Sequence, residues 1–595
     1  MTDTASQATV TRTEAGPRGG VGDSPARPDG RQKVTGEFAY SSDLWLDGML
    51  WGATLRSPHP RALITGLDIT EALALPGVAA IVTHDDVPGH KTYGLERKDQ
   101  PVLAWDRVWY QGEPVALVAA DHPETARRAV ARIAACYQVL PPLTDARAAL
   151  APDAPALHEG GNLVRHVRIR KGRPDTRADV VVRGEYQVGM QDQAFLGPES
   201  GLAVPGEDGG VDLFVATQWL HVDRDQIAAS LGLQPEMIRV TLSGVGGAFG
   251  AREDLSMQIH ACLLALHTGK PVKMVYSRDE SFFGHVHRHP ASLRYEHGST
   301  AEGRLVYVRA DIVLDGGAYA SSSPAVAANA ATLGIGPYEV PHVEMDCYAV
   351  YTNNPPCGAM RGFGAVQACF AYEAQMDKLA AALHMDPVEF RIRNAMREGS
   401  VMPTGQVVDS AAPVAEILDL VRSRPLPPAA PSESGGRDLR GLPGGVSNTT
   451  HGEGVVRGVG YAVGIKNVCF SEGFDDYSTA RVRLELIAGE PTAQVQIHGG
   501  IAQGLGLAVM EEIQVTDGVV RNPSFTDYLI PTILDMPPVR LDVLELADPH
   551  APYGLRGVGE PPTISSTPAV VAAIRAATGL DLARVPVRPE HITGT

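Results

Sequence analysis

The strongest constraint on the fold is a glycine-rich turn that joins a strand pattern to a helix pattern near the middle of the chain. Residues 237–242 read Met-Ile-Arg-Val-Thr-Leu, residues 243–250 read Ser-Gly-Val-Gly-Gly-Ala-Phe-Gly, and residues 253–267 repeat apolar side chains on one helical face. The four glycines let backbone N–H groups approach a ligand, and the helix dipole adds positive partial charge. The turn matches neither of the common nucleotide-binding glycine motifs. It therefore suits an anion or an oxo group, with a tight turn that binds nothing as the equal alternative.

Two further glycine motifs carry polar side chains. Residues 359–364 read Ala-Met-Arg-Gly-Phe-Gly and lead into a helix predicted over 366–384. There Arg361 can donate two hydrogen bonds to a planar acceptor, and Phe363 offers a face for stacking an aromatic ring. Residues 499–506 place Gln503 among glycines, and we expect a third loop there. A solvated arginine on a surface loop is the plain alternative for Arg361.

A carboxylate stands in a rigid frame near the end of the chain. Residues 557–562 read Gly-Val-Gly-Glu-Pro-Pro, just before a helix predicted over 568–577 with Ser565, Ser566 or Thr567 as its cap and Gly579 at its end. The two prolines fix the backbone, so Glu560 is held in one position, as a general base must be. A lone glutamate is otherwise most often a surface charge.

Three histidines alternate at His285, His287 and His289. On a strand they would point to one face and could bind a metal, which is the basis of a metallohydrolase alternative. The neighbouring sequence offers no Asp, Glu or Cys to complete such a site, so this alternative is remote. A Gly-x-Ser-x-Gly nucleophile motif is also absent from the sequence.

Charge and cysteine content exclude several classes of protein. Lys and Arg number 51 against 69 Asp and Glu, which gives a net charge of −18 and disfavours nucleic acid as a partner. The six cysteines form no close cluster, so an iron–sulfur cluster or zinc ribbon carried by this chain is not expected. The first residues lack a secretion signal, and no apolar run approaches 18 residues. We therefore expect a cytoplasmic protein that does not enter membranes.

The order of elements predicts a mixed α+β protein of several domains. We expect a mobile arm over 1–30, a small α/β domain over 31–147 with a strand over 114–120, and a larger mixed region over 160–400. A proline- and glycine-rich loop or linker follows over 424–458, and a last region covers 459–595 with a strand over 480–487.

Together these motifs make the chain resemble the molybdopterin-binding subunits of the xanthine dehydrogenase/aldehyde oxidase family, the molybdenum hydroxylases. The resemblance spans about 36–592, and its carriers are 246–253, Thr217-Gln218, 360–364, 503–506 and 558–562. The opening 21–25 (Val-Gly-Asp-Ser-Pro) and the N-terminal half look closest to bacterial xanthine dehydrogenase chains that work as separate subunits. The resemblance implies an N-terminal hammerhead-like domain followed by two molybdopterin-binding α+β regions.

The resemblance also implies roles for single residues. Glu560 would be the catalytic base, Glu253 and Phe363 would bind and stack the substrate heterocycle, and Asn329 stands where purine oxidisers place an arginine. Gly362 stands where carbon monoxide dehydrogenases carry a cysteine, so that reaction is disfavoured. Molybdenum, held through the pterin, would lie near Gln218, Phe249 and Arg361. The residues expected around the cofactor are Gln218, Gly247, Phe249, Gly250, Arg361, Gln503 and Gly504.

The implied protein is one subunit of a larger oxidoreductase. It would hydroxylate hypoxanthine, xanthine or a related heterocycle with its molybdenum cofactor, a molybdopterin with or without an attached nucleotide. Electrons would pass to an FAD-binding subunit and to a subunit with 2Fe-2S clusters, in an assembly such as a dimer of heterotrimers. A hydroxylase for aldehydes or other N-heterocycles is the first alternative.

One departure from the family pattern affects the last region. In the family, the strand that ends near 495–496 is followed by a long segment with another Gly-Gln-Gly cofactor loop. In this chain Gln496-Ile497 leads directly into His498-Gly-Gly-Ile-Ala-Gln-Gly, so an internal segment near 497 is expected to be missing. Its loss would remove pterin contacts, which leaves a scaffold without cofactor as a further alternative.

Overall fold

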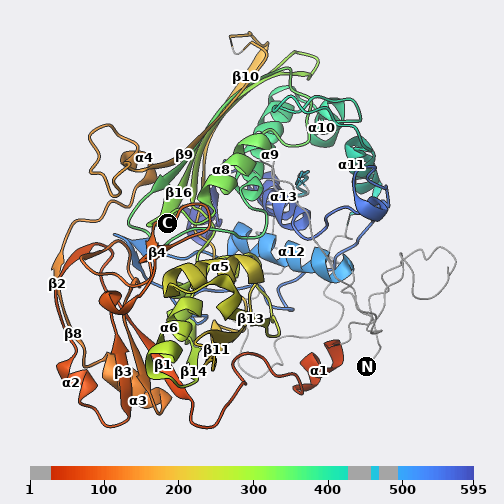
Figure 1. Cartoon of the computed structure of the whole chain (residues 1–595). Coiled ribbons are helices and arrows are strands. Elements are labelled where there is room, and N and C mark those ends of the chain that lie inside the picture. Colours follow the sequence, from red (N-terminus) through yellow and green to blue (C-terminus); the bar gives the residue numbers. More distant parts are fainter. Residues whose placement is uncertain (1–28, 174, 427–456, 468–492, 595) are drawn as a thin grey trace, which may run out of the picture.

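The computed structural model describes residues 29–173, 175–426, 457–467 and 493–594 (Figure 1). The predicted strand over 480–487 lies outside these residues, as do almost all of the predicted arm over 1–30 and most of the predicted linker over 424–458.

A seven-stranded sheet joins two parts of the chain that the sequence pattern separates. The predicted strand over 114–120 is confirmed as β7, and all seven of its residues are buried, as expected for a continuous apolar run inside a sheet. β1 pairs with β7 on one side and runs parallel to β14 on the other, so the predicted N-terminal domain continues directly into the sheet of the following region. The strand order is β13 (Ile238–Leu242), β12 (Val211–Val215), β11 (Ser200–Pro205), β14 (Val272–Val275), β1 (Leu50–Arg56), β7 (Pro114–Ala120) and β3 (Val78–Val82).

The second large sheet has six strands. Its strand order is β20 (Arg584–Val585), β10 (Val180–Val188), β15 (Ala291–Ser299), β16 (Leu305–Gly317), β17 (His342–Tyr351) and β9 (Leu163–Lys171). Helices α8 (Ser323–Thr332) and α9 (Ala365–Ala382) pack against one face of this sheet (Figure 1). β20 comes from the last region of the chain and pairs with β10 of the first, so the C-terminal region is fixed to this sheet.

The remaining elements are short or cover the sheets. The helices are α1 (Gly30–Thr35), α2 (Thr70–Leu73), α3 (Pro123–Val130), α4 (Ala146–Ala149), α5 (Leu220–Leu231), α6 (Gln258–Thr268), α7 (Arg278–Gly284), α10 (Pro387–Asn394), α11 (Val414–Ser423), α12 (Ala493–Val509), α13 (Pro561–Thr578) and α14 (Pro589–Thr593). The other strands are β2 (Ala62–Asp68), β4 (Thr92–Tyr93), β5 (Gln100–Pro101), β6 (Arg107–Val108), β8 (Ala134–Val139), β18 (Val515–Thr516) and β19 (Val519–Val520).

The predicted glycine loop over 499–506 is wrong, because these residues lie inside helix α12. Its glycines serve close helix packing, since a Cβ on Gly504 would lie 1.9 Å from the Ser566 hydroxyl of α13. Thr563 and Thr567 of α13 donate hydrogen bonds of 2.9 Å to the Gly500 and Gly504 carbonyls. Residues 495–496 also belong to α12, so the strand that the family pattern places there is not formed.

Two helix starts also differ from the prediction. Helix α6 begins at Gln258 and not near 253, which leaves Glu253 in the turn before it. Helix α13 begins at Pro561, seven residues before the predicted start, because the Pro561-Pro562 pair suits the first helical turn, where backbone N–H groups have no partner within the helix. Glu560 is therefore its N-cap residue, and the predicted caps at 565–567 lie inside the helix. Gly579 ends the helix in the left-handed conformation, as predicted.

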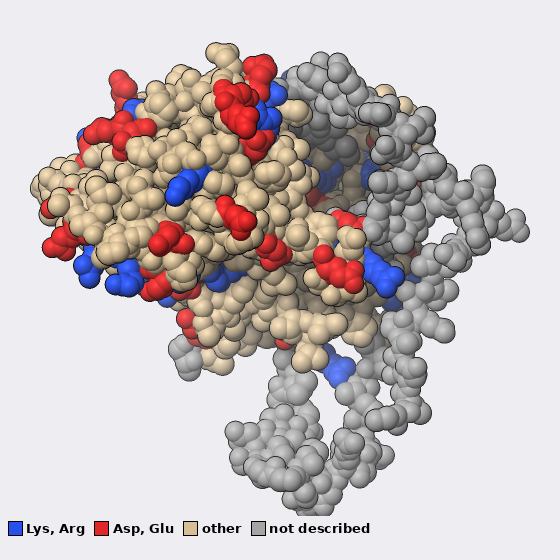
Figure 2. Space-filling model, turned by 60° about the horizontal axis from the view of Figure 1, so that its bottom comes forward, with Lys and Arg blue, Asp and Glu red and all other residues tan. Residues whose placement is uncertain are grey.

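Figure 2 shows one face of the molecule, on which acidic and basic side chains are interspersed. In the part of the chain that the structure describes, no helix is both long enough and apolar enough to cross a membrane.

Candidate functional site

Arg361 lies at the point where three distant segments meet. Its side chain is buried, and its guanidinium donates to the Gly559 carbonyl, to the Gln496 carbonyl at 2.7 Å and to Gln503 Oε1 at 3.4 Å. The loop that carries it is strained, because Phe363 adopts φ 40° between glycines at φ 96° and 89°. This backbone conformation aims Arg361 at α12 and at the turn before α13, and such strain is typical of binding sites.

The glycine-rich turn before α6 packs directly onto the arginine loop. The Arg361 N–H donates a hydrogen bond of 3.0 Å to the Phe249 carbonyl. A Cβ on Gly250, where φ is 108°, would lie 2.5 Å from the Ala359 carbonyl oxygen, so only glycine permits this approach. Phe249 itself has φ 54°, and the residue is 39% exposed. The two motifs predicted separately from sequence therefore form one site.

Gln218 links this turn to Glu253. Its Oε1 accepts from the Gly250 N–H at 3.2 Å, and its Nε2 donates to Glu253 Oε1 at 3.3 Å. The Gln218 backbone is fixed by a hydrogen bond of 2.9 Å from its N–H to the Arg252 carbonyl. Gln218, Gly250 and Glu253 thus lie together, as the sequence motifs imply.

Glu560 is held at both carboxylate oxygens. The Gly362 N–H donates to Oε1 at 2.9 Å, and Lys466 Nζ lies 3.2 Å from Oε2. The first contact places Glu560 beside the arginine loop, although 198 residues separate the two in sequence. The diproline start of α13 keeps Glu560 at the helix N-terminus, which favours a negative charge there.

Lys466 is a site residue that the sequence prediction missed. Its segment runs along α13 toward the N-terminal end of that helix. A Cβ on Gly458 would meet the Ala573 carbonyl, one on Gly460 the Ala569 carbonyl, and one on Gly464 the Ile564 side chain. These close contacts deliver Lys466, whose side chain is 9% exposed, to Glu560. The glycines at 458, 460 and 464 could have indicated a close packing contact for this segment. The helix that they pack against is distant in sequence, so the sequence alone did not identify the contact.

The site holds a second carboxylate in a different electrostatic state. Burial, with added repulsion from the Asp254 and Glu560 carboxylates, raises the pKa of Glu253 to about 8. Near neutral pH Glu253 is therefore largely protonated and can donate a hydrogen bond, whereas Glu560 pairs with a cation. Two carboxylates with different environments are suited to different roles in one reaction.

The raised pKa of Glu253 predicts a pH-dependent stability. A carboxyl with a pKa higher in the folded than in the unfolded chain stabilises the fold at acidic pH, and this contribution is lost as pH rises through about 8. Glu253→Gln removes this ionisation. The parent should lose about 1–2 kcal/mol of unfolding free energy between pH 5.5 and pH 9 that the Glu253→Gln variant does not lose. Thermal unfolding at both pH values measures this, and Glu236→Gln, at an exposed glutamate, should behave like the parent.

The other predicted site residues lie close by in the fold. Gln503 contacts Arg361, and Gly504 packs against α13. Gly247 belongs to the glycine-rich turn, with φ 119°. Asn329 is buried in α8, and this helix borders the end of the arginine loop, since a Cβ on Gly364 would lie 2.3 Å from the Val326 carbonyl.

The three alternating histidines do not act as one set. His289 turns to the Ser323 hydroxyl at 2.8 Å, whereas His285 and His287 both face Asp192. The expectation that no carboxylate lies near them is wrong. The antiparallel pairing of β10 with β15 continues in a bridge between Gln191 and Arg288, which brings Asp192 beside His285 and His287.

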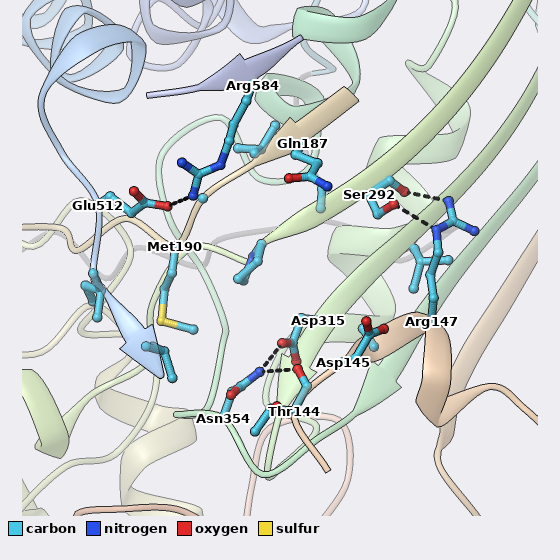
Figure 3. Close-up of a pocket in the computed structure, with 18 of the residues that line it drawn as sticks. Thr144, Asp145, Arg147, Gln187, Met190, Ser292, Asp315, Asn354, Glu512 and Arg584 are labelled. Atoms are coloured by element: carbon cyan, nitrogen blue, oxygen red, sulfur yellow. Dashed lines mark hydrogen bonds and ion pairs between the residues drawn. The ribbon is translucent and has the colours of Figure 1, made fainter. Parts of the chain in front are cut away.

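A polar groove lies away from this site. It has a volume of about 670 Å³ and is lined by residues of β10, β15 and β16 and by residues 512–515 (Figure 3). Arg584 pairs with Glu512 at one end, and Asn354 Nδ2 donates to Asp315 Oδ2 at 2.6 Å near the other. None of the predicted cofactor or substrate residues lines it.

Comparison with known proteins matches three family models to the chain. An a/b hammerhead domain of aldehyde oxidase and xanthine dehydrogenase matches residues 35–141, and molybdopterin cofactor-binding domains match 157–395 and 490–537. The chain is similar to the nicotinate dehydrogenase large molybdopterin subunit of Eubacterium barkeri, with 37% identity over 407 residues, 68% of this chain and 96% of the relative. These matches agree with the predicted hammerhead domain and mixed α/β architecture.

Two longer similarities cover nearly the whole chain. A probable xanthine dehydrogenase subunit of Bacillus subtilis is 29% identical over 729 aligned positions, which cover 96% of this chain and 97% of the relative. Because this chain has 595 residues, at least 134 of those positions (729 minus 595) have no counterpart in it. The aldehyde oxidoreductase structure from Desulfovibrio gigas shares the fold, with a TM-score of 0.82 at 22% identity over 96% of this chain and 80% of that one.

Proposed function

Because the chain belongs to the aldehyde oxidase and xanthine dehydrogenase family of molybdopterin-binding proteins, we propose that it is the molybdenum subunit of a hydroxylase for xanthine or a related N-heterocycle. The observation that carries the proposal is the pair of carboxylates, Glu253 and Glu560, at one cradle formed by Gln218, Phe249 and Arg361. Sequence identity to relatives named for xanthine, nicotinate and aldehydes supports the family chemistry more strongly than one substrate.

The residues present fit an anionic cofactor with a polar edge. Gln218, Gln503 and Arg361 offer amide and guanidinium groups, and the glycines at 247 and 250 keep the turn open to a close ligand. Beneath them Arg288 is fully buried, its Nη2 donates to the Arg361 carbonyl, and its Nη1 has no hydrogen-bond partner among the described residues. The positive charges of Arg288 and Arg361 favour a negative group, such as a pterin phosphate, in this region.

The chain's own residues would position the substrate and move a proton. When bound, the molybdenum cofactor supplies the two-electron oxidation, with water as the source of oxygen. Hydroxylation with water releases protons, and Glu560, fixed by Gly362 and Lys466, is placed to accept one of them. Protonated Glu253 donates a hydrogen bond to a ring nitrogen or carbonyl of the heterocycle. Phe363 stacks on the ring.

Electrons must leave this chain for other carriers. The cysteines of the sequence form no cluster with iron–sulfur spacing, so we assign the 2Fe-2S clusters and FAD to partner subunits, in an assembly such as a dimer of heterotrimers.

A scaffold without cofactor is the second candidate, and the alignment length favours it. The segment near 497 that the family pattern includes has no counterpart in this sequence, and the relative from Bacillus subtilis has at least 134 positions that this chain lacks. The resemblance places a cofactor loop in the segment near 497, so its absence would remove contacts to the cofactor.

Molybdenum content separates the two candidates. We expect the chain, co-expressed with flavin and iron–sulfur partners, to contain close to one molybdenum per chain and to oxidise at least one of xanthine, hypoxanthine, nicotinate or an aldehyde. Elemental analysis of the purified complex, followed by a substrate panel, measures both. A folded complex with less than about a tenth of one molybdenum per chain would support the scaffold instead.

A further inference from the structure

A cluster outside the candidate active site places three metal-ligand atoms at one point. Asp192 Oδ2 lies 2.9 Å from His285 Nε2 and 3.1 Å from His287 Nδ1, and the three atoms all lie within 4.8 Å of one another. The three side chains are at most 1% exposed. Ligand atoms about 2.1 Å from an octahedral or tetrahedral ion lie roughly 3.0–3.4 Å apart. The 3.1 Å spacing falls within this range and the 2.9 Å spacing lies just below it.

The outer atom of each ligand is held by a second group. His285 Nδ1 lies 3.1 Å from Glu199 Oε1, His287 Nε2 lies 3.0 Å from the Phe282 carbonyl, and Asp192 Oδ1 accepts from the Ala194 N–H at 2.6 Å. Metal-binding histidines typically donate their other N–H to a carboxylate or a backbone carbonyl, which fixes the ring for the metal. His287 shows that arrangement, and His285 Nδ1 lies at ion-pair distance from Glu199.

The contact between His287 Nδ1 and Asp192 Oδ2 is favourable only if a positive charge lies at it. Because a carbonyl only accepts, His287 must donate Nε2–H to Phe282, and the neutral ring then turns a bare Nδ1 toward Asp192 Oδ2 at 3.1 Å. Nδ1 accordingly has no hydrogen-bond partner among the described residues. Two lone pairs that face each other in the protein interior repel, unless a cation lies between them.

A divalent ion fits the charge of this cluster. Asp192 and Glu199 bring two negative charges into a buried cluster. Arg252 and Arg278 lie close enough to attract these carboxylates, but their guanidinium groups donate to backbone carbonyls of residues 195–197 and not to the ligand atoms. A divalent ion at the three ligand atoms would balance both charges directly.

We propose that Asp192 Oδ2, His285 Nε2 and His287 Nδ1 bind one zinc ion, with a water as the fourth ligand. Two imidazoles and a carboxylate are a common zinc donor set. Gln191 and Gln193 flank the proposed ligand Asp192, and their side chains donate to the Gln503 and Ala359 carbonyls. The ion would therefore fix residues 191–193, which follow β10 and contact the candidate active site.

Zinc per chain in the purified full-length protein tests the proposal. We expect close to one zinc per chain after growth in zinc-supplemented medium, and less than a tenth in His287→Ala and Asp192→Asn. His297→Ala, at another buried histidine outside the cluster, should keep its zinc. Cobalt substitution of the parent protein should give visible absorption bands of a low-symmetry site.

Either arm of the experiment gives a decision. A folded parent protein with less than a tenth of one zinc and no cobalt bands overturns the proposal and leaves a hydrogen-bonded network. If the variants do not fold, the zinc and cobalt readings of the parent still decide. Molybdenum is measured in the same sample, so a failure of the proposed cofactor function is seen independently of the zinc result.

Discussion

Glu560→Gln should reduce turnover of the molybdenum-loaded complex by about 10²- to 10⁴-fold, the usual contribution of a positioned general base. Glutamine keeps the size of the side chain, and its Oε1 can still accept from the Gly362 N–H that holds Glu560 at 2.9 Å. The substitution removes the proton acceptor, together with the negative charge that pairs with Lys466. Molybdenum per chain should match the parent, and steady-state kinetics with elemental analysis on the same preparation measures the difference.

Lys466→Met provides a comparison within the same contact. It removes the cation 3.2 Å from Glu560 Oε2 but leaves the Gly362 hydrogen bond, so turnover should fall by less, about tenfold, while Lys466→Arg retains most of it. Glu416→Gln, on the surface helix α11, should change nothing. Turnover of Glu560→Gln within a factor of two of the parent would remove the base assignment.

The parts of the site that could be predicted from sequence are those whose motif consists of residues adjacent in the chain. The turn at 246–250 and the loop at 359–364 contain glycines that must adopt positive φ, and such positions are visible in sequence without knowledge of their partners. Glu560 is similar, since its diproline lies beside it. These motifs are brought together by β-sheet pairing and helix packing, which is why Arg361 N–H contacts Phe249.

The parts that could not be predicted depend on contacts between distant segments. The glycines of 499–506 indicate a loop when read alone, and only the neighbouring helix α13 explains them as packing positions. Lys466 becomes a site residue because its segment lies along the same helix. Asp192 reaches His285 and His287 across 93 and 95 positions, so the histidine pattern alone lacked its carboxylate.

Arg361→Met should remove molybdenum from the complex and destabilise the chain. Arg361 donates to oxygen atoms of Gly559, Gln496 and Gln503, and methionine removes the donor that joins these segments. Because these acceptors are only partly shielded from water, losing the donor should cost about 1–2 kcal/mol in total. The same guanidinium is expected at the cofactor, so molybdenum per chain should fall at least tenfold, which elemental analysis and thermal unfolding measure together.

The size of this effect depends on where the arginine lies, and not only on its charge. Arg183→Met removes a side chain that is 74% exposed and pairs with Glu296 on the open face of the sheet, so its cost should stay below about 1 kcal/mol and molybdenum should be unchanged. Arg361 instead joins the turn before α13 to α12 and to the arginine loop, and these carry Glu560, Gln503 and Phe363. If Arg361→Met kept full molybdenum and lost only stability, Arg361 would be a packing residue and the cofactor would have to rest on Gln218 and the glycine-rich turn.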